Sequence, residues 1–366
     1  MDKILNINSK DQIFLDNYFN SYKSLLLETS IGPELFAMRD LCLQVKSSGK
    51  KIIFIGNGAS ASIASHAATD FTQHAGVRSI ALNDHNLITA FGNDYGYQNW
   101  ITKALEAYAD NGDVIVLISS SGKSPNVVNA AHYAKQKGLR LITFTGFSPD
   151  NSLRTLSDLA FWANSTSYNI IECTHLIWIL MAVDLLEFGE SKLNNGSMVE
   201  IVDQLNSAID YSKLLAFRDL CKNVSLAGGK MIYLGNGGSS SIASHAATDF
   251  TKQSKIRSVA FNDHNLLTCF SNDFGYDQWM AEALKSYSDP ADAIVLISSS
   301  GRSINILNAA DTAHSINLPI ITFSSFDSDN PLRSRGKINF WVNSNKYGVA
   351  SAIHSILIFT VADLLA

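Results

Sequence analysis

A histidine and an aspartate four residues apart are the first candidates for chemistry in this chain. The stretch "SIASHAATDF" carries Ser62, His66 and Asp70. Positions i, i+4 and i+8 share one face of an α-helix, so we expect these side chains to line up. An imidazole beside a carboxylate can transfer protons or hold a divalent metal ion. The alternative is a structural polar pair whose hydrogen bonds are satisfied within a helix bundle.

Two polar loops follow predicted strands and suit an anion. "GNGAS" (56–60) comes directly after "KIIFI", and "SSSGKS" (119–124) comes directly after "DVIVLI". Ligands of open parallel sheets bind beyond the carboxyl ends of the strands. Hydroxyls and N–H groups at a helix N-terminus favour a phosphate there, although serines can also simply cap a helix. We expect Ser60 to cap the helix after the first loop. Neither loop has nucleotide-loop spacing, so no nucleotide cofactor is expected.

These features occur twice in the sequence, at an offset of 179 residues. Residues 51–100 and 230–279 are identical at 32 of 50 positions without a gap. The offset pairs His66 with His245 and Asp70 with Asp249, and it pairs the serine-rich loop with "SSSGRS" at 298–303. A tandem repeat of this length predicts two domains, 1–190 and 191–366, each of common domain size.

Each half contains five short apolar runs that alternate with helical patterns. Strands that are apolar throughout are typical of a parallel sheet covered on both faces. We therefore predict an α/β protein with two domains, each a five-stranded parallel sheet in a flavodoxin-like three-layer αβα sandwich with a leading helix. The leading helical patterns cover 11–48 and 198–227, and a polar linker is expected at 188–197. The predicted strands are 51–56, 78–82, 113–119, 140–146 and 159–164, then 230–235, 257–261, 292–298, 319–325 and 338–343.

Composition and charge favour a cytoplasmic protein. The net charge is −5, which argues against a general nucleic-acid partner. The longest apolar run, 175–188, is short for a membrane span and contains Asp184, so we expect a buried core helix and no membrane partner. The first residues lack the apolar core of a signal peptide. The four cysteines have no CxxC spacing and are expected to be buried thiols in a reducing compartment.

The combined motifs resemble a known family. A strand, GNGxS and a helix, then "GNDYG" (92–96) or "SNDFG" (271–275), then a strand and SSSGxS, closely resemble the sugar isomerase (SIS) domain. Within it the phosphoheptose isomerases are nearest. The resemblance implies an aldose–ketose isomerase that converts sedoheptulose 7-phosphate to a heptose 7-phosphate through an enediol. Alternatives are an isomerase of another phosphosugar and a non-catalytic sugar-phosphate-binding or scaffold protein.

The resemblance also implies which residues bind the substrate. In the family the serine-rich loop binds the phosphate, and the first loop and the "NDYG" stretch line the sugar. The positions expected here are Asn57, Ser60, Asp94, Ser119, Ser120, Ser121 and Ser124, and then Asn236, Ser239, Asp273, Ser298, Ser299, Ser300 and Ser303.

The catalytic residues depart from the family's pattern. The family's base is a glutamate four residues after a histidine, and Asp70 and Asp249 replace it with a side chain one methylene shorter. The family's last helix supplies a Gln and, eight residues later, a His. Ungapped matching places Glu172 and Leu180 there, and Ser351 and Phe359 in the second half. The catalytic residues expected are Asp70, His66, Glu172, His175, Asp249, His245 and His354.

A zinc ion and a partner copy are further expectations from the resemblance. Zinc would be held by His66, Asp70 and Glu172, with His175 as a further ligand or proton donor. The family forms homotetramers with shared active sites. We therefore expect this tandem chain to form a homodimer of four domains, with unequal sites because only the first half has a carboxylate at its Glu172 position.

Overall fold

The computed structural model describes residues 7–189 and 196–366. The chain forms two compact units, one of residues 24–199 and one that combines residues up to 23 with residues 200–366. The division expected from the sequence, 1–190 and 191–366, therefore differs from the observed grouping at the N-terminus. Most of the expected linker lies outside the described residues, and so do residues 1–6 of the N-terminal stretch.

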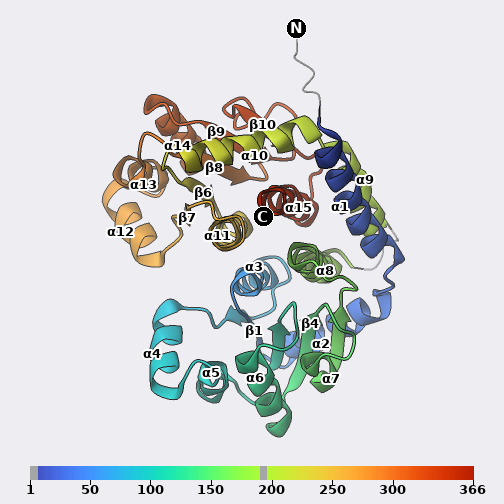
Figure 1. Cartoon of the computed structure of the whole chain (residues 1–366). Coiled ribbons are helices and arrows are strands. Elements are labelled where there is room, and N and C mark those ends of the chain that lie inside the picture. The colour runs from blue at the N-terminus through green and yellow to red at the C-terminus, as the bar shows by residue number, and fades with distance from the viewer. Residues whose placement is uncertain (1–6, 190–195) are drawn as a thin grey trace. The chain divides into compact units, whose positions relative to one another are not determined.

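The unit of residues 24–199, which includes the strands labelled β1 and β4 in Figure 1, has a five-stranded parallel sheet with the order β2-β1-β3-β4-β5. This is the flavodoxin-like order that the sequence predicts. The strands are β1 (Ile52–Gly56), β2 (Ser79–Ala81), β3 (Val114–Ile118), β4 (Arg140–Thr145) and β5 (Leu159–Trp162). The helices are α2 (Gly32–Ser47), α3 (Ala59–Gln73), α4 (His85–Tyr95), α5 (Trp100–Tyr108), α6 (Pro125–Gln136), α7 (Ser152–Leu156) and α8 (Tyr168–Phe188).

The other unit repeats this sheet, with the equivalent order β10-β9-β8-β6-β7. Its strands are β6 (Met231–Gly235), β7 (Ser258–Ala260), β8 (Ala293–Ser298), β9 (Ile320–Ser324) and β10 (Ile338–Trp341). Its helices are α10 (Tyr211–Leu226), α11 (Gly238–Lys252), α12 (His264–Phe274), α13 (Trp279–Tyr287), α14 (Ile304–Ser315) and α15 (Tyr347–Leu365). Two further helices, α1 (Ser9–Glu28) and α9 (Gly196–Ala208), cross the boundaries between the units.

Both faces of the first sheet are covered, which is why its central strands are apolar throughout. Ile53 and Leu117 point to one face and pack with Trp100 of α5 and Val127 of α6. Phe54 points to the opposite face, where its ring lies 5.2 Å from that of Phe71 on α3. Successive strand residues point to opposite faces, so a sheet with helices on both sides requires apolar residues at every position.

The two most apolar helices are core helices. In the described residues, α8 and α15 are long and apolar enough to cross a membrane by length and composition, but their apolar windows are 89% and 78% buried. The expectation of a core helix at 175–188 is thus confirmed by α8. Cys42, Cys173 and Cys221 are buried as expected. The expectation is wrong for Cys269, which is exposed because no residue of α12 is buried.

Most of helix α1, up to Lys23, belongs to the second unit, and its polar and aromatic partners lie there. Asp11 forms an ion pair with Arg218 of α10 at 2.8 Å. The Tyr211 hydroxyl donates to Asp16 Oδ1 at 2.7 Å, and the Tyr211 ring stacks on Phe19. These contacts explain the grouping of residues up to 23 with residues 200–366.

Candidate functional site

The serine loop of the first half, residues 119–124, joins β3 to α6 at the carboxyl end of the sheet. The hydroxyl oxygens of Ser119 and Ser124 are 3.4 Å apart, and Ser119 and Ser120 are buried. Lys123 N donates to Ser121 Oγ at 3.3 Å. Ser124 occupies the N-cap position of α6, but its side chain makes no capping hydrogen bond. The Ser124 hydroxyl therefore does not act as a conventional cap, which favours an anion-binding role over simple capping.

A glycine with a left-handed backbone shapes this loop. Gly122 has φ +62°, and a Cβ there would lie 2.0 Å from Asn151 Oδ1. Asn151 is buried and held by Arg154 N, which donates to Asn151 Oδ1, and by its own donation to Ser148 O. The loop can approach Asn151 this closely only with glycine at position 122.

The second serine loop, residues 298–303, repeats this geometry between β8 and α14. The hydroxyls of Ser298 and Ser303 are 3.3 Å apart, and Arg302 N donates to Ser300 Oγ at 3.2 Å. Ser298 and Ser299 are buried. The Arg302 side chain forms an ion pair with Asp327 at 3.1 Å. Both halves therefore carry a hydroxyl-rich loop with a basic residue.

The first loop, residues 56–60, places a glycine rather than a serine at the helix start. Gly58 is the N-cap of α3 with φ +53°, and Ser60 lies buried inside the first helical turn. The expected capping role of Ser60 is therefore wrong. In the second half Gly237 is likewise the N-cap, of α11. Gly56 allows the close approach of β1 and α3, since a Cβ there would lie 2.5 Å from the Ser60 carbonyl carbon.

Two residues that the sequence analysis did not single out join this loop to its neighbours. Asn57 Nδ2 donates to Asn126 Oδ1 at 3.0 Å, and Asn126 Nδ2 donates back to Asn57 Oδ1 at 2.9 Å. The Tyr97 hydroxyl also donates to Asn57 Oδ1, at 3.3 Å. The only sequence signal for Asn126 and Tyr97 is their recurrence as Asn305 and Tyr276 at the repeat offset.

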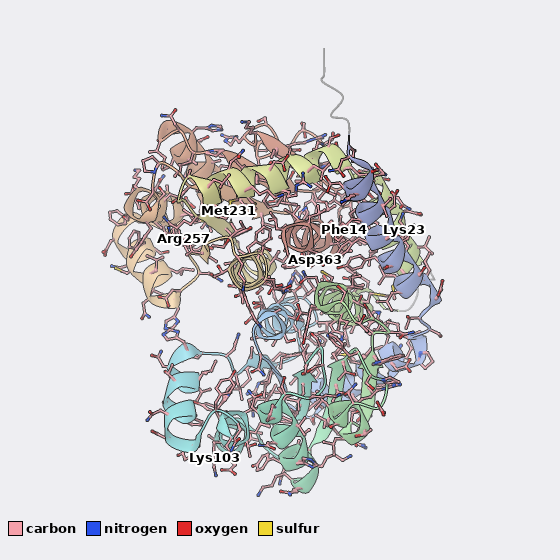
Figure 2. All side chains as sticks on the ribbon, in the orientation of Figure 1. Phe14, Lys23, Lys103, Met231, Arg257 and Asp363 are labelled. Carbon is pink, nitrogen blue, oxygen red and sulfur yellow. The ribbon has the colours of Figure 1, made fainter. Side chains whose placement is uncertain are left out.

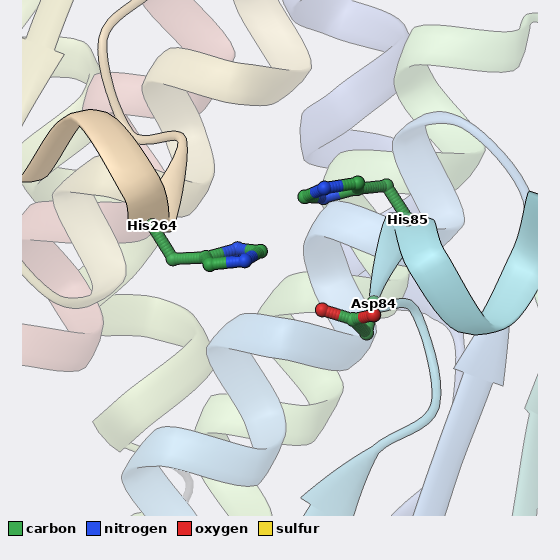
Figure 3. A group of neighbouring side chains, drawn as sticks. All are labelled: Asp84, His85 and His264. Carbon is green, nitrogen blue, oxygen red and sulfur yellow. The ribbon is translucent and has the colours of Figure 1, made fainter.

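Asp94 lies near the end of α4, on a helix without buried residues. This helix begins at His85, directly after Asp84 (Figure 3). The Asp84 carboxylate accepts from Asn86 N and Leu87 N. The backbone N–H groups hold the pKa of Asp84 below its usual value.

Asp94 itself is exposed and accepts from its neighbour Asn93 at 2.9 Å. Asp273 is exposed in the same way and accepts from Asn272. The stretch "GNDYGY" therefore contacts Asn57 through Tyr97 and not through Asp94. The last residue of α4 contacts Lys103 of α5 (Figure 2), whose Nζ pairs with Glu106 and lies 5.6 Å from the ring centre of Tyr95.

The His–Asp pairs form as the helical spacing predicts. His66 Nε2 lies 3.2 Å from Asp70 Oδ2 on α3, and His245 Nε2 lies 3.1 Å from Asp249 Oδ2 on α11. Both histidines are buried. In the second half the ring of Phe359 on α15 packs against His245, with the ring centroids 3.9 Å apart. Each pair offers a carboxylate oriented by an imidazole, which suits general base chemistry.

Glu172 contacts the serine loop of its own half. The Ser120 hydroxyl donates to Glu172 Oε1 at 3.0 Å, and both side chains are buried. Within the described residues, no group of three potential metal ligands combines Glu172 with His66 and Asp70. The expected zinc ligand set is therefore not assembled by these three residues. The second half has the buried Ser351 at the equivalent position.

His175 and His354 are core histidines, which corrects the expectation that they act in catalysis. His175 Nε2 faces the carbonyl oxygen of Thr145 at 3.0 Å, and its ring lies edge-on to that of Phe144. His354 Nε2 faces Ser324 O at 3.1 Å in the same way. Complete burial lowers the pKa of each imidazole to about 4. Both rings are therefore neutral at pH 7 and bonded to the backbone.

Comparison with known families identifies the repeated unit. The family model described as "SIS domain" matches residues 17–146 and 196–325, two ranges related by the repeat offset and together more than half of the chain. The chain belongs to the SIS domain family. The two SIS domains account for the two parallel sheets and for the duplicated serine loops.

Relatives of this SIS protein include phosphoheptose isomerases. Phosphoheptose isomerase of Burkholderia pseudomallei is 36% identical over 144 residues, which are 38% of this chain and 73% of the relative. Phosphoheptose isomerase of Geobacter sulfurreducens is 34% identical over 167 residues, which are 44% of this chain and 88% of the relative. The structure of tagatose-6-phosphate ketose/aldose isomerase from Escherichia coli matches 100% of this chain and 95% of its own, with a TM-score of 0.63 and 15% identity. At that identity the likeness concerns the fold.

Proposed function

We propose that this SIS protein is an aldose–ketose isomerase of a phosphosugar, with sedoheptulose 7-phosphate as the substrate. The observation that carries the proposal is the geometry of the serine loops, in which several hydroxyls gather at a helix start and the serine at the N-cap position makes no capping hydrogen bond. The likeness to phosphoheptose isomerases supports this choice of substrate. The phosphate is remote from the reacting carbons, so its binding energy can serve to orient them.

The proposed chemistry needs a base that transfers a proton between two neighbouring carbons. Asp70, or Asp249 in the second half, removes the proton from C1 of the ketose while the C2 carbonyl oxygen gains a proton, which gives the enediol. Return of the carbon-bound proton to C2 and loss of the O1 proton then give the aldose. His66 lies 3.2 Å from Asp70 and orients its carboxylate for these transfers.

Zinc is a separate proposal, and none of the steps above involves it. Each His–Asp pair offers one nitrogen and one oxygen ligand, whereas catalytic zinc sites use three protein ligands. Treatment with a chelator followed by zinc addition tests whether activity depends on the metal.

A non-catalytic sugar-phosphate-binding protein is the second candidate, and Phe359 favours it. The aromatic ring packs on His245 at the position where the sugar isomerase pattern has a histidine, and Leu180 takes this position in the first half. A binding protein would keep the serine loops but would not need an acid at this position.

The test is an assay of purified protein with sedoheptulose 7-phosphate, with and without zinc, that follows formation of the aldose. The Asp70→Asn Asp249→Asn double variant is the matched control, because it keeps the size of both side chains and removes both bases. Aldose formation that this variant loses supports the isomerase. Binding of the phosphosugar without aldose formation supports the second candidate. We further propose that the chain forms a homodimer in the cytoplasm, which sedimentation of the pure protein tests for the assembly.

A further inference from the structure

Asn57 and Asn126 form an amide pair whose orientation is fixed by the backbone. Val127 N donates to Asn126 Oδ1 at 3.1 Å. A backbone N–H can only donate, so the atom that it faces must be the side-chain oxygen and not the nitrogen. This assigns Asn126 Nδ2 to Asn57 Oδ1, and Asn57 Nδ2 to Asn126 Oδ1.

The acceptor positions of the pair are filled. Asn126 Oδ1 accepts from Val127 N and Asn57 Nδ2, and Asn57 Oδ1 accepts from Asn126 Nδ2 and the Tyr97 hydroxyl. A carbonyl oxygen has two lone pairs, so neither oxygen has a lone pair left. Each amide nitrogen has two N–H groups and uses one inside the pair, so each keeps one N–H for another acceptor.

The same arrangement recurs in the second half. Asn236 and Asn305 exchange hydrogen bonds of 2.9 and 3.0 Å, and Ile306 N donates to Asn305 Oδ1 at 3.0 Å. The Tyr276 hydroxyl donates to Asn236 Oδ1 at 3.2 Å. Four hydrogen bonds thus have the same directions in two domains whose sequences differ at many positions.

We propose that Asn126 and Asn305 are positioning residues that make the half-buried Asn57 and Asn236 donor-only groups for the ligand. The inference rests on the proposed function, since Asn57 follows β1 at the ligand-binding end of the sheet and bonds to the helix that begins after the serine loop. Asn57 then selects an acceptor oxygen of the phosphosugar chain, either a carbonyl or a hydroxyl lone pair, and disfavours a group that can only donate. Tyr97 and Tyr276 contribute by filling the last lone pair.

The test compares two ligands by calorimetry, inorganic phosphate and sedoheptulose 7-phosphate. In the Asn126→Leu Asn305→Leu double variant, the amides of Asn57 and Asn236 can rotate, and in the first half Val127 N keeps its second acceptor, Ser124 O. We expect the affinity for sedoheptulose 7-phosphate to fall roughly three- to tenfold, the scale of one neutral hydrogen bond, and the affinity for phosphate to stay the same. Asn129→Leu on the exposed side of α6 is the control and should change neither affinity.

A second variant keeps the proposal testable if the leucine protein does not fold. Tyr97→Phe Tyr276→Phe removes two exposed hydroxyls, leaves the amide pairs intact and should lower the affinity for the sugar phosphate roughly twofold. If either variant loses affinity for both ligands to the same extent, or keeps its full affinity for the sugar phosphate, the positioning role is overturned. The proposal that the serine loops of the wild-type protein bind phosphate would then still stand. A wild-type protein that binds neither ligand overturns the proposed function and the inference with it.

Discussion

The ring of Phe359 packs against the imidazole of His245, with the two ring centroids 3.9 Å apart. The pattern of the sugar isomerase family has a histidine at this position of the last helix, one that can act as an acid or a ligand. The side chain of phenylalanine has neither an acidic proton nor a lone pair, so it can act neither as an acid nor as a metal ligand beside the imidazole. Because the first half has Leu180 there and adds Glu172 against its serine loop, the two halves differ chemically around similar loops.

The first prediction concerns this inequality. Asp70→Asn and Asp249→Asn remove the same base from the two halves, and general base catalysis is worth about 10²- to 10⁴-fold. We expect at least one of these substitutions to slow catalysis in its own half by at least about 100-fold. Because the halves are unequal, the total turnover of the protein should fall by different amounts in the two variants. Steady-state rates measured with circular dichroism as the folding control check this. Equal losses in two folded variants would contradict unequal sites.

The serine loops should bind the phosphate of the substrate. Replacing Ser121 or Ser124 by alanine removes a donor to a buried anion, and so does replacing Ser300 or Ser303. A hydrogen bond to a charged group contributes about 1.5–3 kcal/mol, so calorimetry should show affinities at least tenfold weaker at the altered half. Ser47→Ala, at an exposed position of α2, is the control. Unchanged affinity in all four loop variants would rule out this role.

Gly122→Ala should damage its loop more than an equivalent change elsewhere. Gly122 and Gly138 both have left-handed φ, +62° and +69°, but only at Gly122 would the new methyl group collide with Asn151. The backbone strain alone costs about 1–2 kcal/mol. We expect Gly138→Ala to lose only this amount, whereas Gly122→Ala should lose more stability and also weaken phosphosugar binding. Urea unfolding and calorimetry measure the two effects, and equal results for the two variants would show that the contact with Asn151 is unimportant.

The two core histidines should make the protein less stable in mild acid. His175 and His354 have a pKa of about 4 in the folded chain, whereas the ordinary value is 6.5. Between these values the unfolded state binds more protons, so the free energy of unfolding falls as the pH falls from 6.5 towards 4. The slope is at most about 1.4 kcal/mol per pH unit for each histidine.

Urea unfolding at several pH values checks this slope. His175→Gln His354→Gln should flatten it, even though the variant is less stable at pH 7. His132→Gln, at an exposed position of α6, should leave the slope unchanged. A slope that survives the double substitution would assign the acid sensitivity to other groups.

Thiol reactivity should distinguish one cysteine from the other three. Cys269 is exposed, whereas Cys42, Cys173 and Cys221 are buried. Burial raises the pKa of Cys42 to about 12 and that of Cys221 still further, which suppresses their thiolates. The native protein should therefore react with about one equivalent of a thiol reagent, and the remaining thiols should react only after unfolding. A Cys269→Ser variant should lose the fast-reacting thiol.

Much of the fold was predictable because buried parallel strands have a plain sequence signal. The runs from "KIIFI" to "LAFW" are apolar at nearly every position, and the repeat at offset 179 confirms each element twice. The serine loops were predictable for a related reason, since strand ends locate the ligand side of such a sheet. These features can be recognised from residues that are adjacent in the sequence.

The features that were missed depend on partners far away in the sequence. Ser60 looked like a helix cap, but the left-handed Gly58 takes that position. His175 looked reactive beside Glu172, yet the two residues bond to different partners, the Thr145 carbonyl and the Ser120 hydroxyl. The importance of Asn126 follows only from its bond to Asn57, 69 residues away.

Helix α1 packs against residues that the ribosome makes much later. Asp16 on α1 bonds to Tyr211, a partner 195 residues later in the chain. At about 5–20 residues per second, a ribosome needs roughly 10 to 40 s to make that stretch. During this time α1 has emerged without its stacking and charged partners, while residues 24–199 already contain a whole sheet. Helix α1 is thus made long before the residues it packs against, and the nascent chain has to keep its apolar face from other contacts until the second domain is complete.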